Sequence, residues 1–294
     1  MIQDFLHSKL IDEYGESVTN NIIEGYLKER PITFRVNVSK ISVDKVKGIL
    51  NKKNIDFEEV SWYKDAFIIK NTEKSRIEKL DIYKNGEIYL QSLSSMLPVL
   101  SLKVNEGESV LDMAASPGGK TTQLYCLYKN IRITAIEKDK IRFERLKYNI
   151  EKQGITSISV LNMDSLNLDD LMKFDNILLD APCSGSGKIQ KSAKLFLNDK
   201  VLNNFSILQE KLLRKALKIL KPGSEMIYST CSILKEENEN VIDRVIKDFD
   251  VSVISLEKEL EFVPKLPTTI KGVICVCPDD LFEGFFVAKL RKNS

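Results

Sequence analysis

The strongest constraint on the fold is an alternation of strand patterns and helix patterns that begins near residue 109. Short apolar runs predict buried strands at 109–113, 133–137, 157–161, 174–180 and 226–230. Amphipathic stretches predict helices between or after them, at 118–128, 138–153, 199–220 and 236–249. Because parallel strands are joined by crossover helices, this order predicts an α/β fold with a mostly parallel sheet covered on both faces.

The remaining segments complete two expected domains. Three late strands follow one another without helices, which predicts an antiparallel edge hairpin, at 251–254, 273–276 and 284–290. The first part of the chain predicts a small α+β unit that begins with two short helices separated near Gly15. We therefore expect a small N-terminal α+β domain over 1–103 and a larger α/β domain over 104–294.

The cysteine and histidine content argues against several classes of protein. Five scattered cysteines, an odd number, argue against a disulfide framework and favour a reducing, cytoplasmic location. The single histidine, His7, argues against Ser-His-Asp hydrolases, Cys-His proteases and His-ligated metal sites. We expect neither a signal peptide nor a membrane span, because no run approaches the ~20 apolar residues that a span needs. The net charge of +2 leaves nucleic-acid binding open.

A glycine-rich turn, Leu-Asp-Met-Ala-Ala-Ser-Pro-Gly-Gly-Lys-Thr (111–121), joins the first strand of the alternation to a helix. Its glycines allow a ligand to approach the backbone, and the helix that follows begins with free N–H groups. The turn has neither the G-x-G-x-x-G nor the Walker glycine spacing, and Asp112 would repel a pyrophosphate. An acidic loop suits a cationic cofactor without phosphate, namely S-adenosylmethionine.

Two further acidic residues follow the next two predicted strands. Glu137 ends the strand about twenty residues after the glycine turn, where doubly wound sheets place an acid on the ribose hydroxyls. Asp164 follows the third strand and is placed to receive the adenine amino group. In register with the glycine turn, these residues strengthen the prediction of an adenosine-containing cofactor.

Two cysteines lie on loops that follow predicted strands: Cys183 in Asp-Ala-Pro-Cys-Ser-Gly-Ser-Gly (180–187) and Cys231 in Tyr-Ser-Thr-Cys-Ser (228–232). Carbon 5 of a pyrimidine is a poor nucleophile, but a thiolate that adds to carbon 6 makes carbon 5 reactive toward an electrophilic methyl group. A thiolate is both a good nucleophile and an acceptable leaving group. Asp180 lies three residues before Cys183 and is placed to bind the amino edge of a cytosine.

Taken together, these motifs resemble the Nop/Sun family of RNA cytosine-5 methyltransferases over nearly the whole chain. The resemblance implies a Rossmann-like class I methyltransferase sheet preceded by a small α+β domain. It is carried by the glycine turn, by both cysteine motifs, and by three further segments: Arg-Pro-Ile-Thr-Phe-Arg-Val-Asn (30–37), Tyr-Leu-Gln-Ser-Leu-Ser-Ser-Met (89–96) and Gly-Phe-Phe-Val-Ala-Lys-Leu (284–290).

The resemblance also implies roles for individual residues. Cys231 would be the nucleophile and Cys183 would assist release of the product, although DNA cytosine-5 methyltransferases use the cysteine of the Pro-Cys motif. Asp180 would line both the cofactor pocket and the base pocket, Glu137 would hold the ribose and Asp164 the adenine. The turn would wrap the methionine and ribose end of S-adenosylmethionine, and Arg142 would touch the cofactor. The residues of the turn concerned are Ala114, Ala115, Ser116, Pro117, Gly118, Gly119 and Lys120.

Some positions differ from the usual family pattern. Ala114 stands where many members have cysteine, and Ser116 stands where alanine is common. In place of an arginine-rich segment the chain has Lys188, Lys191 and Lys194. Neither change in the turn removes a reacting group, so we expect the chemistry to be intact and the details of RNA contact to differ.

The leading hypothesis is an S-adenosylmethionine-dependent enzyme that methylates carbon 5 of a cytosine in structured RNA. Ribosomal RNA is the first expectation and transfer RNA the second; we expect a monomer without a metal or a membrane. The base would be unstacked into the active site, with phosphate contacts from basic residues and a contribution from the N-terminal unit. A solvated helix face is an equally good explanation for the last four of these residues: Lys188, Lys191, Lys194, Lys211, Arg214, Lys215 and Lys218.

Two alternatives stand beside this hypothesis. One is an RNA-binding ribosome assembly factor that keeps the fold without turnover, which loss of a thiol or of an acidic cofactor residue would favour. The other is a methyltransferase of small molecules, in which the paired thiols would have no purpose. The sequence retains both cysteines and both acids, which favours the RNA-methylating enzyme.

Overall fold

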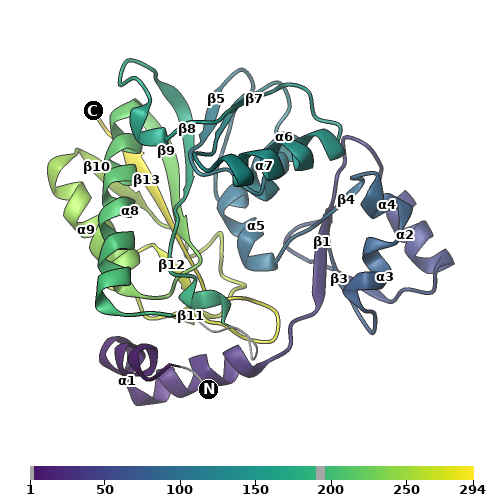
Figure 1. The fold of residues 1–294 in the computed structure, drawn as a ribbon, viewed down its shortest axis with the longest axis horizontal. Helices are drawn as coiled ribbons and strands as arrows, with labels where there is room; N and C mark the ends of the chain where they lie inside the picture. The colour runs from purple at the N-terminus through teal and green to yellow at the C-terminus, as the bar shows by residue number, and fades with distance from the viewer. Residues whose placement is uncertain (1–2, 190–195) are drawn as a thin grey trace.

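The structure, a computed structural model, describes residues 3–189 and 196–294 and contains two β-sheets (Figure 1). The larger sheet has the strand order β11-β12-β13-β9-β8-β5-β6-β7, and β10 pairs with β13. Its parallel half confirms the alternation predicted from the sequence. These strands are β5 (Ser109–Asp112), β6 (Arg132–Ile136), β7 (Ile158–Leu161), β8 (Phe174–Asp180) and β9 (Leu220–Thr230).

The late strands form the antiparallel edge that the sequence predicts. β13 (Phe285–Lys292) pairs antiparallel with β9, and Phe286 lies opposite Thr230. Both β10 (Val251–Ile254) and β12 (Ile274–Val276) pair antiparallel with β13. A two-residue strand that the sequence pattern did not predict, β11 (Lys265–Leu266), pairs with β12.

Helices cover both faces of the larger sheet because its strands are apolar on both sides. In β8, Ile177 and Leu179 join a core with Leu213 and Leu217 of α8 (Asp199–Ile219). Leu178, between them in sequence, points to the opposite core, which contains residues of α5 and α6. The helices on this second side and at the β6 end are α5 (Leu93–Leu100), α6 (Gly119–Leu127) and α7 (Lys140–Lys152).

The helix expected over 236–249 is wrong as a single element. The chain instead forms a 3₁₀ turn at Lys235–Glu237, the short helix α9 (Glu239–Val245) and a second 3₁₀ turn at Ile246–Asp248. Asn238 interrupts the helix with a φ of −118° and a ψ of −99°. Its side chain donates to the Ser232 carbonyl (3.0 Å) and accepts from the Thr230 hydroxyl (2.6 Å), so it is tied to the loop that contains Cys231.

The smaller sheet is antiparallel throughout, with the order β2-β3-β1-β4. Its core contains Phe34 and Phe67, whose rings stack 5.4 Å apart. The elements of this unit are β1 (Ile32–Val36), α2 (Val43–Lys52), β2 (Phe57–Glu59), β3 (Ala66–Ile69), α3 (Lys74–Glu78), α4 (Asp81–Lys84) and β4 (Ile88–Leu90).

Among the described residues, none of the helices has the length and apolar character that a membrane span requires.

The first helix, α1 (Asp4–Leu27), lies against the larger domain, on the side of α8 and β11 and away from the small sheet (Figure 1). The predicted break is confirmed, because Gly15 has a φ of 75° and kinks the helix. Leu6, Leu10 and Ile22 are buried in the same core as the residues of α8. The N-terminal segment therefore contributes to the core of the larger domain.

Candidate functional site

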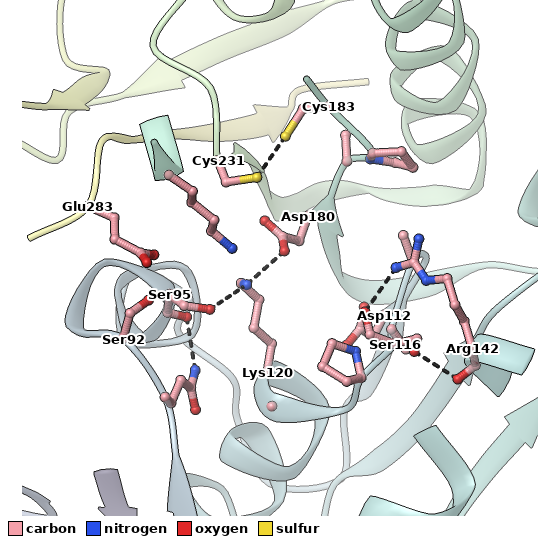
Figure 2. Close-up of a pocket in the computed structure, with 18 of the residues that line it drawn as sticks. Ser92, Ser95, Asp112, Ser116, Lys120, Arg142, Asp180, Cys183, Cys231 and Glu283 are labelled. Carbon is pink, nitrogen blue, oxygen red and sulfur yellow. Dashed lines mark hydrogen bonds and ion pairs between the residues drawn. The ribbon is translucent and has the colours of Figure 1, made fainter. Parts of the chain in front are cut away.

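A cavity of about 640 Å³ opens where the carboxyl ends of β5, β8 and β9 meet the segment between β4 and α5 (Figure 2). Ligands of doubly wound sheets bind at this end of the strands. Asp180, Cys183 and Cys231 all line the cavity, as the sequence predicts. It also contains six of the seven predicted residues of the glycine turn: Ala114, Ala115, Ser116, Pro117, Gly119 and Lys120.

Gly118, the seventh residue of the turn, forms the backbone bend and does not line the cavity. Its φ of 101° lies in the left-handed region, and α6 begins at the next residue. A side chain at Gly119 would be crowded, because a Cβ there would lie 3.0 Å from the ring of Tyr89. The two glycines thus allow the chain to turn from β5 into α6 close to Tyr89 of β4.

A smaller cavity of about 120 Å³ adjoins the first and shares Ala114, Arg142 and Pro182 with it. Glu137 and Asp164, the two acids predicted for the adenosine, both line this smaller cavity. Glu137 is only 5% exposed and lies 3.4 Å from Nε of Arg142. The predicted cofactor residues therefore form a continuous set from the glycine turn to the end of β7.

Asp112 places a carboxylate oxygen without a partner at the wall of the larger cavity. The residue is 1% exposed, and its Oδ2 accepts from the Thr121 hydroxyl at 2.7 Å. Its Oδ1 is buried and has no hydrogen bond to any described residue. Burial raises the pKa of Asp112 to about 6, against the lowering effect of the Thr121 hydrogen bond. A buried acceptor of this kind suits the ammonium group of a ligand.

Asp180 and Lys120 form an ion pair in the middle of the larger cavity. Lys120 Nζ lies 2.7 Å from Asp180 Oδ2 and 2.9 Å from the Ser95 hydroxyl (Figure 2). Asp180 Oδ1 accepts from the Ser229 hydroxyl at 2.8 Å. The ammonium of Lys120 therefore points to the β8 carboxylate, and Asp180 is held by contacts from two other elements, α6 and β9.

The two cysteine sulfurs point toward each other from neighbouring loops (Figure 2). Their Sγ atoms lie 2.9 Å apart, and both residues are free thiols. The hydrogen bond from Cys183 is the main reason why the pKa of Cys231 is lowered. The same hydrogen bond, followed by burial, raises the pKa of Cys183 well above its usual value. Cys231 therefore ionises first, and Cys183 remains its protonated partner.

Hydrogen bonds behind the cavity fix both cysteine loops. Glu237, which is 0% exposed, accepts from the amide (2.8 Å) and the hydroxyl (2.5 Å) of Ser184. The hydroxyls of Ser186 and Ser232 are 2.8 Å apart and link the two loops directly. These contacts hold the sulfur atoms in register without using a residue of the cavity wall.

The sequence interpretation missed the part of the wall that comes from outside the strand-end loops. The stretch from β4 to the start of α5 contributes Tyr89, Gln91, Ser92 and Ser95. It lies in the motif 89–96, for which the sequence indicated no chemical role. Phe205 of α8 and Glu283 before β13 are also in the wall. Their positions depend on tertiary contacts and have no local signature in the sequence.

The basic residues predicted to contact RNA lie in different environments in the structure. Lys188 lines the larger cavity, and Lys191 and Lys194 lie outside the described residues. Arg214 pairs with Asp248 at 2.6 Å, and Lys215 pairs with Asp170 at 2.5 Å. The charges of Arg214 and Lys215 are thus matched by carboxylates of the protein itself.

Comparison with known proteins identifies two family matches. A family model described as 16S rRNA methyltransferase RsmB/F matches residues 99–291. A second, described as the ferredoxin-like domain of the RsmF/B-like methyltransferases, matches residues 3–75. Among curated proteins, the chain is 36% identical over 280 residues to the ribosomal RNA small subunit methyltransferase F of Aliivibrio fischeri. That match covers 90% of this chain and 59% of the relative, so the chain spans about three fifths of its length.

Two solved structures are similar over almost the whole chain. A methyltransferase homologue from Pyrococcus horikoshii is 35% identical, with a TM-score of 0.85 and coverage of 99% of this chain and 95% of the other. NSun6 from Pyrococcus horikoshii, crystallised with SFG, has a TM-score of 0.84 at 23% identity and covers 99% of this chain and 98% of its own. At this identity the second match shows the fold alone. On the family match and the 35% identity together, the chain belongs to the RsmB/F family of methyltransferases, which is of the Nop/Sun type.

Proposed function

We propose that this protein transfers a methyl group from S-adenosylmethionine to carbon 5 of a cytosine in RNA, through a covalent cysteine–base intermediate. The observation that carries the proposal is the pair of thiols, 2.9 Å apart, in the same cavity as the glycine turn. A methyltransferase that acted on a nucleophilic oxygen or nitrogen would have no use for two sulfurs beside the methyl donor.

The residues at the site fit S-adenosylmethionine. Glu137 is buried just after β6 and would accept the ribose hydroxyls, and Asp164, which lines the same cavity, would accept from the adenine amino group. The unpartnered Oδ1 of Asp112 is available for the ammonium of the methionine part. When bound, the cofactor supplies an electrophilic methyl group on a sulfonium sulfur.

Cys231 begins the reaction as a thiolate. Its sulfur bonds to carbon 6 of the cytosine, and the electron pair of the carbon 5–carbon 6 double bond moves to carbon 5, which takes the methyl group. Asp180 binds the amino edge of the base, while Lys120 holds that carboxylate in place at 2.7 Å. The low pKa of Cys231 relative to Cys183 supports this assignment of the nucleophile.

Cys183 completes the reaction by removing the proton from carbon 5. While Cys231 is a thiolate, its negative charge keeps Cys183 protonated. Once the Cys231 sulfur is bonded to carbon, that charge is gone and Cys183 ionises more easily. Loss of the carbon 5 proton restores the double bond, the bond from sulfur to carbon 6 breaks, and Cys231 leaves as a thiolate.

The proposed substrate is ribosomal RNA, because the curated relative is named as a ribosomal RNA small subunit methyltransferase. Transfer RNA is the alternative substrate. The basic lining residue Lys188 and the small N-terminal sheet are the proposed contacts to RNA outside the target base. We place the enzyme in the cytoplasm, as a monomer without a metal.

Bisulfite sequencing of total RNA from cells with and without the gene tests this proposal. We expect one or a few cytosines of ribosomal RNA to lose their resistance to conversion when the gene is removed, and to regain it when the wild-type gene is restored. Restoration with a Cys231→Ala gene is the matched control and should not recover the signal. If resistance to conversion is lost only in transfer RNA, the substrate is transfer RNA and not ribosomal RNA. If the conversion pattern of all RNA is unchanged, the proposed activity is refuted.

A further inference from the structure

Lys188 lies where it could have a second role besides the proposed contact to RNA phosphates. It ends the 3₁₀ turn Ser186–Lys188, which follows Cys183 and begins after Gly185, whose φ is 76°. It lines the same cavity as Cys183, Cys231 and Asp180. Although its side chain is exposed, Lys188 belongs to the loop that contains Cys183, so it can act on the thiols as well as on RNA phosphates.

The backbone of this turn is bonded directly to Cys231. The amide of Gly187, next to Lys188, donates to the carbonyl of Cys231 at 2.9 Å. On its other side the Gly187 carbonyl accepts from the amide of Gly284, also at 2.9 Å. A Cβ at Gly187 would lie 2.0 Å from the Gly284 carbonyl oxygen, so the backbone segments at Gly187 and Gly284 are too close for a side chain at position 187. The backbone at Lys188 is therefore fixed next to the Cys231 loop, and its side chain lines the same cavity as Cys231.

Among the described residues, Lys188 forms no direct ion pair with a carboxylate, in contrast to Lys120 in the same cavity. Lys120 forms the 2.7 Å ion pair with Asp180. Among the described residues, the ammonium of Lys188 makes neither an ion pair nor a hydrogen bond. Glu283 and Asp180 act on this ammonium without a direct contact, so it can also attract an anion that forms in the cavity. The anion that the proposed chemistry requires is the thiolate.

We propose that Lys188 is a further active-site residue whose ammonium holds Cys231 as a thiolate before RNA arrives. This inference rests on the proposed function, in which Cys231 is the nucleophile. The groups that face the Cys231 sulfur are the Cys183 thiol from the same loop as Lys188, Asp180 at the end of β8 and Lys120 of α6. Glu283, before β13, faces Lys188 from the opposite wall.

The charge balance agrees with this arrangement. Burial lowers the pKa of Lys188, but the negative charges of Cys231, Glu283, Asp180 and Cys183 outweigh it and raise the pKa, so the ammonium stays charged. For Cys231 the hydrogen bond from Cys183 is the largest lowering effect, and the charge of Lys188 is the larger of the two cationic ones. Because removal of a cation favours the neutral thiol, loss of Lys188 raises the pKa of Cys231.

Alkylation of the full chain with iodoacetamide, without RNA and without cofactor, tests the inference. The rate of modification of the Cys231 peptide is followed by mass spectrometry across the pH range in which thiols titrate. Lys188→Met should move the midpoint of this rate profile up by about one pH unit, as expected for loss of one nearby opposite charge. Lys188→Arg keeps the positive charge, so the midpoint of its profile should stay close to that of the wild type. Lys129→Met, which changes an exposed lysine just beyond the C-terminal end of α6, is the matched control and should leave the profile unchanged.

The possible outcomes separate the inference from the proposed function. An unchanged Cys231 profile in Lys188→Met, in protein that unfolds at the wild-type temperature, would overturn the inference. If the profile is unchanged and only the KM for RNA rises, Lys188 is a phosphate contact and not a partner of the thiolate. If the profile shifts as expected but the wild-type protein methylates no RNA, the thiolate pairing stands and the proposed function fails.

Discussion

The guanidinium of Arg35, in β1 of the small sheet, donates to the carbonyl of Gly119, the first residue of α6, at 2.9 Å. Arg35 is 0% exposed and also donates to the side chains of Gln91 (2.9 Å) and Thr122 (2.5 Å). The N-terminal unit thus reaches the turn that lines the cofactor cavity through one buried cation. The position of the glycine turn therefore depends on a residue of the other sheet.

Replacement of this cation tests the coupling between the two units. Arg35→Met should lower the free energy of unfolding by about 2–3 kcal/mol, because buried acceptors lose a charged donor. It should also weaken binding of S-adenosylmethionine, which calorimetry measures. Arg35→Lys should not rescue the protein, because a single ammonium lacks the planar fork that serves three acceptors. The exposed Arg145→Met on α7 is the control; equal effects of Arg35→Met and Arg145→Met would contradict the role.

The nucleophile assignment predicts a separation of binding from turnover. Cys231→Ala should abolish transfer of the methyl group to RNA while leaving cofactor affinity close to that of the wild type, since the cofactor contacts come from other residues. The measurement pairs a tritium-transfer assay with calorimetry on one preparation. If Cys231→Ala still methylates RNA, Cys231 is not the nucleophile and Cys183 becomes the candidate.

The second thiol predicts a trapped intermediate. Cys183→Ala should accumulate a protein–RNA adduct that survives denaturation, because nothing removes the carbon 5 proton and Cys231 stays bonded to the base. The adduct is detected as a shifted band on a denaturing gel. Cys183→Ser is the matched variant: its hydroxyl still donates to the Cys231 thiolate, so its adduct should form at lower pH than that of Cys183→Ala. The double variant Cys183→Ala/Cys231→Ala should form none.

The buried acid at the end of β6 predicts the strength of cofactor binding. Glu137→Ala should weaken S-adenosylmethionine binding by about 1.5–3 kcal/mol, roughly 10- to 150-fold, through loss of charge-assisted hydrogen bonds to the ribose. Glu151→Ala, on the exposed face of α7, should leave the affinity unchanged. An affinity for Glu137→Ala equal to that of the control would argue against the ribose role.

Asp112 predicts a pH dependence of stability. Its pKa is raised by burial from 3.8 to about 6, so the folded state favours the protonated acid. The stabilising contribution is present below the unfolded pKa and is lost as pH rises toward about 6. Asp112→Asn, which stays neutral, should therefore gain stability relative to the wild type as pH increases through this window. Urea unfolding at both ends of the window measures it; a constant difference would contradict the shifted pKa.

The same substitution separates stability from function. Asn at position 112 presents an amide in place of the carboxylate whose Oδ1 is unpartnered in the cavity wall. Cofactor binding should therefore weaken even where the folded protein is more stable. Stability and cofactor affinity should thus change in opposite directions, as we expect of a ligand-binding group that destabilises the protein when no ligand is bound.

Much of the larger domain follows from local sequence patterns. The strands from β5 to β8 follow the predicted apolar runs closely, and Gly118 allows the bend that starts α6. In contrast, β9 begins at Leu220, before its predicted start at residue 226. The residues Glu137 and Asp164 follow strand ends, so their meeting in one cavity follows from a parallel sheet. Local pattern was sufficient wherever the site is built from strand ends.

Other features depended on contacts between segments that are distant in sequence. The break at Asn238 results from hydrogen bonds to Thr230 and Ser232, which helix periodicity does not encode. The wall residue Ser95 meets Lys120 only because α5 packs beside α6. Similarly, the sequence predicted Lys188 only as a possible RNA contact, and the hydrogen bond from the Gly187 amide to the Cys231 carbonyl places its turn next to the Cys231 loop.

The packing of α1 on the larger domain has a consequence for any shortened version of the protein. The hydroxyl of Tyr14 donates to the carbonyl of Ile233, and the hydroxyl of Tyr26 donates to the carbonyl of Ser186 at 2.6 Å. Each carbonyl lies within three residues of a reacting cysteine, although neither tyrosine lines the cavity. A fragment without α1 would keep both cysteines but lose these two hydrogen bonds, so we expect both cysteine loops to be less well fixed although α1 itself does not line the cavity.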